Sequence, residues 1–274
     1  MAGFYGTDLV GDESIPANAR AGLLIVHGMA EHRGRYVDAV RRLTRQGLAC
    51  FTFDLRGHGD SPGDRADIDS FQIFVNDLLA IRAGIARGHS RLPLFIWAHS
   101  LGTIVAIRCV EQDGERLGGV ITSGCPIAAF QRVPAPLRGV LKALCTPFSG
   151  LQVDPGLGAE QLSHSREVQQ SYVADPRVPG KVTVRLLIEL EGACRAALDD
   201  AGSITVPWLA MHGGADQIAP PQGSKQLVDA LGSSDKTLEL FAGMRHEVHN
   251  ELEPTPTDFY ARMVHWIDAH ASPG

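Results

Sequence analysis

A short apolar run that ends at a serine constrains the fold of this chain more than any other stretch. Residues 94–97 are continuously apolar and follow Pro93, as expected for a strand buried on both faces of a parallel sheet. Residues 101–112 carry apolar side chains at helical spacing. Ser100 is therefore predicted to lie in a tight strand-to-helix turn, where the first N–H groups of the helix face a bound molecule.

The residues around this turn, Ala98-His-Ser-Leu-Gly102, resemble the nucleophile elbow G-x-S-x-G of α/β-hydrolases, with alanine in place of the first glycine. A serine that only caps a helix gives a similar pattern, so other residues must decide between the two interpretations. A serine hydroxyl becomes an effective nucleophile when a histidine takes its proton and a carboxylate orients that histidine. In this fold the acid precedes the histidine, and each follows a late strand.

Asp216 and His246 satisfy this order. Residues 204–211 are predicted as a strand that ends shortly before Asp216, and residues 237–241 as the last strand, followed closely by His246. Each residue also has a simpler interpretation, Asp216 as a helix cap and His246 as a solvated loop residue. Their occurrence together with Ser100 favours a catalytic triad.

The turn after the first strong strand, residues 23–26, is a candidate for stabilising a reaction intermediate. It contains Gly28, and a glycine-containing turn at this place can present a free backbone N–H group. We assign one donor of an oxyanion hole to the N–H of Met29.

Strands and helices alternate along most of the chain, which predicts a mostly parallel sheet with helices on both faces. Residues 126–201 interrupt the alternation, so we expect a hydrolase core of residues 1–125 and 202–274 with a helical lid of residues 126–201 inserted between them. The remaining elements are predicted as strands at 48–53 and 117–122 and helices at 35–46, 71–86, 181–197, 222–231 and 258–269.

The insertion carries a stripe of apolar residues at helical spacing. Such a stripe packs onto the body of the protein or, in part, lines an acyl channel or touches a membrane or micelle surface. Its residues are Val133, Leu137, Val140, Leu141, Leu144 and Phe148.

Charge and composition exclude several classes of protein. The formal net charge is -6, without a basic stripe, which argues against a nucleic-acid partner. No apolar run approaches the length of a membrane span, and the N-terminus lacks the pattern of a signal peptide, so we expect a cytoplasmic protein. Five scattered cysteines suit reduced thiols. No metal or organic cofactor is expected, because no third ligand is suitably spaced from His246 and His249.

Over residues 23–269 the chain resembles the monoacylglycerol lipase and lysophospholipase branch of the serine α/β-hydrolases. The resemblance implies hydrolysis of an ester between a fatty acyl chain and a small polar alcohol such as glycerol, and hence a small lipid ester as the partner. It rests on the elbow and on four further motifs: His27-Gly-Met-Ala-Glu-His32 with Arg35-Tyr36, Asp54-Leu-Arg-Gly-His-Gly-Asp-Ser61, Tyr172-Val-Ala-Asp-Pro176 and His246-Glu-Val-His-Asn-Glu251.

The resemblance also implies roles for individual residues. By motif position, the oxyanion donors are the backbone N–H groups of Met29 and Leu101. Glu31, Arg35 and His249 resemble the residues that hold the glycerol head group, although a surface salt bridge or a solvated side chain explains each of them equally well. Lysophospholipase or general carboxylesterase activity remains an alternative, as does a non-catalytic ligand-binding member of the fold.

The chain departs from the family pattern at several positions. Ala30, Ala98 and Thr103 stand where glycine is common in the family. Residues 4–21 are short for the two antiparallel strands with which the family usually begins, which leaves open whether one strand is missing.

Overall fold

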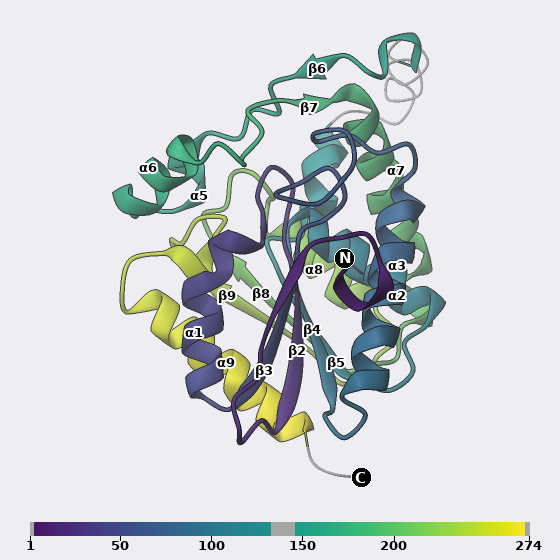
Figure 1. Cartoon of the computed structure of the whole chain (residues 1–274). Coiled ribbons are helices and arrows are strands. Elements are labelled where there is room, and N and C mark those ends of the chain that lie inside the picture. The colour runs from purple at the N-terminus through teal and green to yellow at the C-terminus, as the bar shows by residue number, and fades with distance from the viewer. Residues whose placement is uncertain (1–2, 133–145, 272–274) are drawn as a thin grey trace.

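A seven-stranded sheet forms the centre of the molecule, and the computed structural model describes residues 3–132 and 146–271 of it (Figure 1). The first strand pairs antiparallel with its neighbour, and all other neighbours are parallel. The sheet is thus mostly parallel, as predicted. In spatial order its strands are β1 (Gly11–Ser14), β3 (Leu48–Phe53), β2 (Ala21–Val26), β4 (Leu94–His99), β5 (Leu117–Ser123), β8 (Trp208–Gly213) and β9 (Lys236–Phe241).

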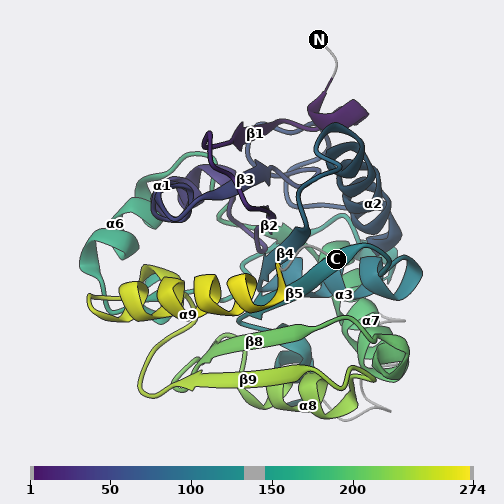
Figure 2. The same ribbon diagram turned by 90° about the horizontal axis from the view of Figure 1, so that it is seen from below.

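Helices cover both faces of this sheet (Figure 2). Every residue of β2, β3, β4 and β8 is buried, which explains why these strands are continuously apolar and do not alternate. One face packs against α1 (Val37–Arg45) and α9 (Thr255–His270). The other packs against α2 (Phe71–Gly88), α3 (Leu101–Gln112), α7 (Val184–Asp200) and α8 (Gln222–Ala230).

The N-terminal part contains less sheet than is usual in the family that the sequence resembles. Within the described residues, β1 is the one strand that precedes β2, and residues 4–6 form a short 3-10 helix instead. The second N-terminal antiparallel strand is therefore missing from the described part of the chain.

Most described elements of residues 126–201 lie above the carboxyl ends of the strands, at the top of Figure 1, whereas the last helix of this segment runs down beside α3. Most of the apolar stripe predicted there falls outside the described residues, and its last member, Phe148, is exposed. The described elements are two short paired strands, β6 (Gln152–Val153) and β7 (Val182–Thr183), and the helices α5 (Ala159–Leu162), α6 (Arg166–Ala174) and α7.

Several predicted boundaries differ from the structure by one to four residues, and two of these differences have a clear local cause. The helix predicted from residue 181 begins at Val184, because residues 182–183 pair with β6 and the Thr183 hydroxyl caps the helix by accepting from the Leu186 N–H at 3.1 Å. The strand predicted from residue 204 begins at Trp208, after a 3-10 turn and Pro207. Apolar residues such as Ile204 are buried in both places, so the hydrophobic pattern did not mark the ends of these elements.

The helices of the described residues include none with the length and apolar character required to cross a bilayer.

Candidate active site

Ser100 occupies the turn between β4 and α3, with φ 51° and ψ −122°. This conformation costs a non-glycine residue about 1–3 kcal/mol. Hydrogen bonds to β5 and to β4 itself hold the turn. The Ser100 N–H donates to the carbonyl of Ser123 in β5 at 2.9 Å. The Thr103 hydroxyl lies 3.3 Å from the same carbonyl and 3.2 Å from that of Ala98 in β4. The Ser100 side chain makes no capping hydrogen bond to the helix, so the simpler interpretation of this serine fails.

Two glycines allow the loop after β2 to approach this turn. A Cβ atom at Gly102 would lie 2.5 Å from the carbonyl oxygens of Val26 and His27, so only glycine permits this contact between α3 and the end of β2. A Cβ atom at Gly28 would lie 2.8 Å from the Cβ of Ser100. The loop that contains Met29 is therefore brought directly beside the serine.

Asp216 and His246 form a buried pair beyond the carboxyl ends of β8 and β9. Nδ1 of His246 lies 2.7 Å from Oδ2 of Asp216, and Oδ1 accepts the backbone N–H groups of Ile218 and Ala219, each at 2.9 Å. Asp216 therefore also organises the local turn, whereas His246 is buried and not a solvated loop residue. The bond fixes the orientation of the imidazole, with Nδ1 facing the carboxylate.

The two groups of this pair shift each other's pKa. Burial alone raises the pKa of Asp216, but the neighbouring His246 and His212 lower it by more, so that the carboxyl stays ionised. Burial alone lowers the pKa of His246, but the Asp216 carboxylate outweighs burial and places this pKa above its ordinary value of 6.5. The arrangement thus stabilises a protonated imidazole beside a carboxylate, which is the state that a general base reaches after taking a proton.

His212 is a second histidine on Asp216, and the sequence analysis assigned it no role. Its Nε2 lies 3.1 Å from Oδ2 of Asp216 and 2.8 Å from the carbonyl of Ala219, while its Nδ1 lies 2.6 Å from the hydroxyl of Ser224. All of these groups are buried. The signal available in the sequence was its position at the end of β8, four residues before Asp216.

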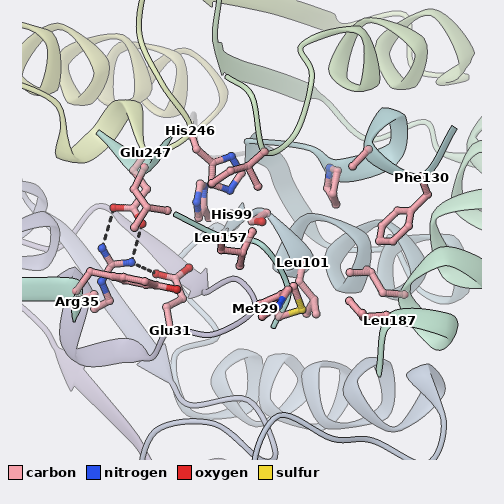
Figure 3. Close-up of a pocket in the computed structure, with 18 residues that line it drawn as sticks. Met29, Glu31, Arg35, His99, Leu101, Phe130, Leu157, Leu187, His246 and Glu247 are labelled. Atoms are coloured by element: carbon pink, nitrogen blue, oxygen red, sulfur yellow. Dashed lines mark hydrogen bonds and ion pairs between the residues drawn. The ribbon is translucent and has the colours of Figure 1, made fainter. Parts of the chain in front are cut away.

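Ser100 and His246 line the same cavity, which has a volume of about 320 Å³ (Figure 3). Among the described residues, the His246 ring is hydrogen-bonded to Asp216 and not to Ser100. Contacts between a nucleophile and its base are often long without substrate and tighten when substrate binds. The predicted residues Met29, Leu101, Glu31 and Arg35 line the same cavity.

The two ends of the cavity differ in polarity. In Figure 3, Phe130 and Leu187 lie on one side, whereas Arg35, Glu31 and Glu247 gather on the other, with His246 between the two groups. Most of the apolar residues that line the cavity come from the insertion: Pro126, Ala129, Phe130, Pro155, Leu157, Leu162, Leu187 and Leu190.

Met29 and Leu101 lie side by side at the cavity wall (Figure 3). Leu101 is the first residue of α3, so its N–H has no partner within the helix. Met29 lies in the loop that Gly28 brings against Ser100. Both residues line the cavity. The two N–H groups are therefore available to an oxygen atom bound there.

An ion-pair cluster occupies the polar end. Arg35 binds Glu247 with two hydrogen bonds, of 2.6 and 2.8 Å, and Glu31 with one of 3.0 Å. Glu31 also accepts the hydroxyl of Tyr36 at 3.0 Å, and the ring of Tyr172 covers the Arg35 guanidinium at 4.9 Å. Both carboxylates are almost fully buried, so this is not a surface salt bridge.

His249 lies behind the cavity and does not line it. Its ring is stacked on Tyr36 at 5.6 Å and packs edge-on against Trp97 at 5.2 Å, in the core between the sheet and α9. Burial lowers the pKa of His249 to about 4, so the ring is neutral at pH 7. This position does not support the expected contact between His249 and a head group. Sequence spacing places His246 and His249 in one loop but does not show which of them faces the cavity.

A mostly parallel sheet covered by helices, with a serine on a strained turn at one strand end and a buried acid–histidine pair after two later strands, defines an α/β-hydrolase. Residues 17–253 match the family described as Hydrolase_4, serine aminopeptidase, S33. The chain belongs to this family.

Individual relatives are similar over most of their length. A monoacylglycerol lipase of Mycolicibacterium smegmatis is 33% identical over 255 residues, which cover 92% of this chain and 91% of the relative. The human monoglyceride lipase is 28% identical over 250 residues, covering 90% and 82%. The crystal structure of Paleococcus ferrophilus monoacylglycerol lipase superposes with a TM-score of 0.83 at 29% identity, over 96% of this chain and 100% of that one. The predicted fold and the resemblance are confirmed, and the chain is a carboxylic ester hydrolase.

Proposed function

We propose that this enzyme hydrolyses monoacylglycerols to fatty acid and glycerol through an acyl-enzyme on Ser100. The observation that carries the proposal is a single cavity that holds Ser100 and the Asp216-bound His246 between an apolar wall and a polar end. A fatty acyl chain suits the apolar side, and a small alcohol suits the polar side. The names of the relatives support the same substrate class.

The first half of the reaction forms the acyl-enzyme. The Ser100 hydroxyl oxygen attacks the acyl carbonyl carbon while Nε2 of His246 takes the hydroxyl proton. Asp216 stabilises the resulting imidazolium through Nδ1. The carbonyl oxygen becomes an oxyanion that accepts the N–H groups of Met29 and Leu101. When the intermediate collapses, the ester C–O bond breaks and the glycerol oxygen receives the proton from His246.

The second half releases the fatty acid. His246 takes a proton from a water molecule, and the water oxygen attacks the acyl carbon. A second oxyanion forms at the same two N–H groups. The bond to Ser100 then breaks, and the serine oxygen recovers its proton from His246. The enzyme returns to its starting state with no added cofactor in either half.

The insertion covers the cavity in this proposal. Residues 126–201 act as a lid on a core formed by residues 1–125 and 202–274, and they supply most of the apolar wall against which the acyl chain rests. Phe148, Leu151 and Val173 are exposed apolar side chains of this lid and are available to touch a micelle or membrane surface. The four cysteines within the described residues are free and buried, which supports the proposed cytoplasmic location.

The test is hydrolysis of 1-monoacylglycerols of graded chain length by the wild type and by Ser100→Ala. If Ser100 forms the acyl-enzyme, the variant loses about 10⁶ in kcat. The matched control is Ser203→Ala, at an exposed serine outside the cavity, which should leave the rate unchanged. A fluorophosphonate probe should label Ser100 in the folded protein. A Ser100→Ala rate within tenfold of wild type would rule out the mechanism, and failure of Ser100 to label would favour a non-catalytic binding protein.

A further inference from the structure

In the proposed complex, the polar end of the cavity holds the alcohol part of the substrate. We propose that it selects uncharged alcohols and excludes phosphate-bearing head groups, and that Glu247 is the residue that sets this selectivity. The inference rests on the proposed function, because it concerns the leaving group of the same ester. It distinguishes a monoacylglycerol lipase from a lysophospholipase of the same fold.

Arg35 is the residue that a phosphate group would need. Among the described residues that line the cavity, it is the one arginine or lysine. A free guanidinium binds phosphate with two parallel hydrogen bonds. In this structure, Glu247 already occupies that fork, with Nη1 donating to Oε1 at 2.6 Å and Nη2 to Oε2 at 2.8 Å.

The second hydrogen of Nη1 and one face of the guanidinium are used as well. Nη1 donates to Oε2 of Glu31 at 3.0 Å, and the Tyr172 ring lies over the guanidinium with its centroid 4.9 Å from Cζ. The Arg35 side chain is only 10% exposed. A phosphate that took the place of Glu247 on Arg35 would displace a buried carboxylate, which would then lack a partner of opposite charge.

The charge balance of the cluster opposes a second anion. With both carboxyl groups ionised, Glu31 and Glu247 outweigh the single positive charge of Arg35. Burial raises the pKa of Glu31, and a proton on that group would make the cluster neutral but not positive. At an effective dielectric constant of about 20, a like charge about 6 Å away changes an equilibrium about a hundredfold. Phosphate-bearing esters should therefore bind poorly at this end.

An uncharged hydroxyl group, in contrast to a phosphate, can donate hydrogen bonds to the carboxylates at this end. Ionised carboxylates are acceptors, and each oxygen can accept more than one hydrogen bond. Oε1 of Glu31 already accepts from the Tyr36 hydroxyl and the Gly28 backbone N–H, whereas within the described residues its Oε2 accepts only from Arg35. Oε2 of Glu247 accepts from Arg35 and from the Asn250 amide at 2.8 Å, and its Oε1 accepts from Arg35. The remaining lone pairs suit the hydroxyl donors of glycerol, and no net charge needs to be neutralised.

The experiment compares two esters that differ only in the phosphate, 1-decanoylglycerol and 1-decanoylglycerol 3-phosphate, below their aggregation concentrations. For the wild type, kcat/KM should favour the uncharged ester by about a hundredfold. Glu247→Gln keeps the size of the side chain and removes the one net negative charge, so it should remove most of this hundredfold preference, mainly through a lower KM for the phosphate ester. Glu31→Gln removes the other charge and leaves the Arg35–Glu247 fork in place, so it should narrow the preference in the same direction.

Glu239→Gln is the matched control, because it removes the same charge from β9 outside the cavity, where Glu239 pairs with Arg262. It should leave the preference unchanged. Equal hydrolysis of the two esters by the wild type, or an unchanged preference in both cavity variants, overturns the inference and leaves the proposed function standing. Hydrolysis of neither ester by the wild type overturns the proposed function itself.

Discussion

The Glu251 carboxylate accepts two hydrogen bonds from His164, one from its backbone N–H at 3.0 Å and one from its ring Nδ1 at 2.9 Å. The same carboxylate accepts the backbone N–H of Arg245 at 3.0 Å. His164 lies in the insertion, between α5 and α6, and Arg245 directly precedes His246. Glu251 therefore connects the insertion, through hydrogen bonds, to the segment around Arg245 that positions the proposed catalytic base, His246.

We predict that Glu251→Gln lowers kcat about tenfold with a smaller change in KM. The amide keeps one acceptor oxygen but turns an N–H₂ group toward donors, so at least one of the three hydrogen bonds is lost. A small displacement of His246 then affects the reacting geometry more than substrate binding. Steady-state kinetics with a monoacylglycerol checks this prediction.

The matched control for this change is Glu253→Gln, two residues further along the chain. Its side chain is 52% exposed and pairs with Arg42 on the surface. The kinetic constants of this control should equal those of the wild type. A Glu251→Gln enzyme with kcat within twofold of wild type would show that the contact between the insertion and this segment does not position His246.

The pH dependence of activity follows from the raised pKa of His246. The general base must be neutral to accept a proton, and its protonated fraction grows as the pH falls. We predict that kcat/KM declines on the acid side with an apparent pKa above 6.5. Asp216→Asn removes the carboxylate that raises this pKa, so the acid limb should move to lower pH while kcat falls about 10⁴-fold.

A surface pair provides the control for the pH experiment. Asp235 lies 2.9 Å from His270, and Asp235→Asn should leave the pH profile unchanged. Two results would contradict the assignment of His246 as the titrating base. One is an apparent pKa below 6.5 for the decline of kcat/KM in the wild type, and the other is an apparent pKa that stays the same in Asp216→Asn.

The strained turn at Ser100 predicts an effect on stability that is separate from catalysis. Ser100→Gly should unfold with a free energy about 1 kcal/mol larger than Ser100→Ala, because glycine adopts φ 51° without the steric cost that alanine keeps. Urea denaturation of the two inactive variants measures this difference.

The same pair of substitutions at Ser203 should give the opposite sign. Ser203 lies in a 3-10 helix without a positive φ, so glycine there should be less stable than alanine by about 0.5–1 kcal/mol. If glycine is also the less stable variant at position 100, the turn is not strained in solution.

Much of the fold was predictable because its signals are local. The continuous apolar strand at 48–53 and the helix at 101–112 were predicted with the boundaries that the structure has. Burial on both faces of a parallel sheet leaves a continuous apolar pattern, and helical packing leaves a period of 3.6 residues. The order of Ser100, Asp216 and His246 was likewise readable, because each residue follows a strand of the sheet.

The chemistry of the polar end was decided by the tertiary structure. Arg35 and Glu247 are 212 positions apart, and nothing in the local pattern around either residue shows that they meet in a buried bidentate pair. His249 and His246 share one loop, yet only packing against Tyr36 and Trp97 turns the first away from the cavity. The sequence by itself determined the strands and helices of the main sheet layers and the order of the residues of the proposed triad, since those depend on local burial and periodicity. Which charges are paired, and which ring faces the substrate, depends on contacts that form only when distant segments pack together.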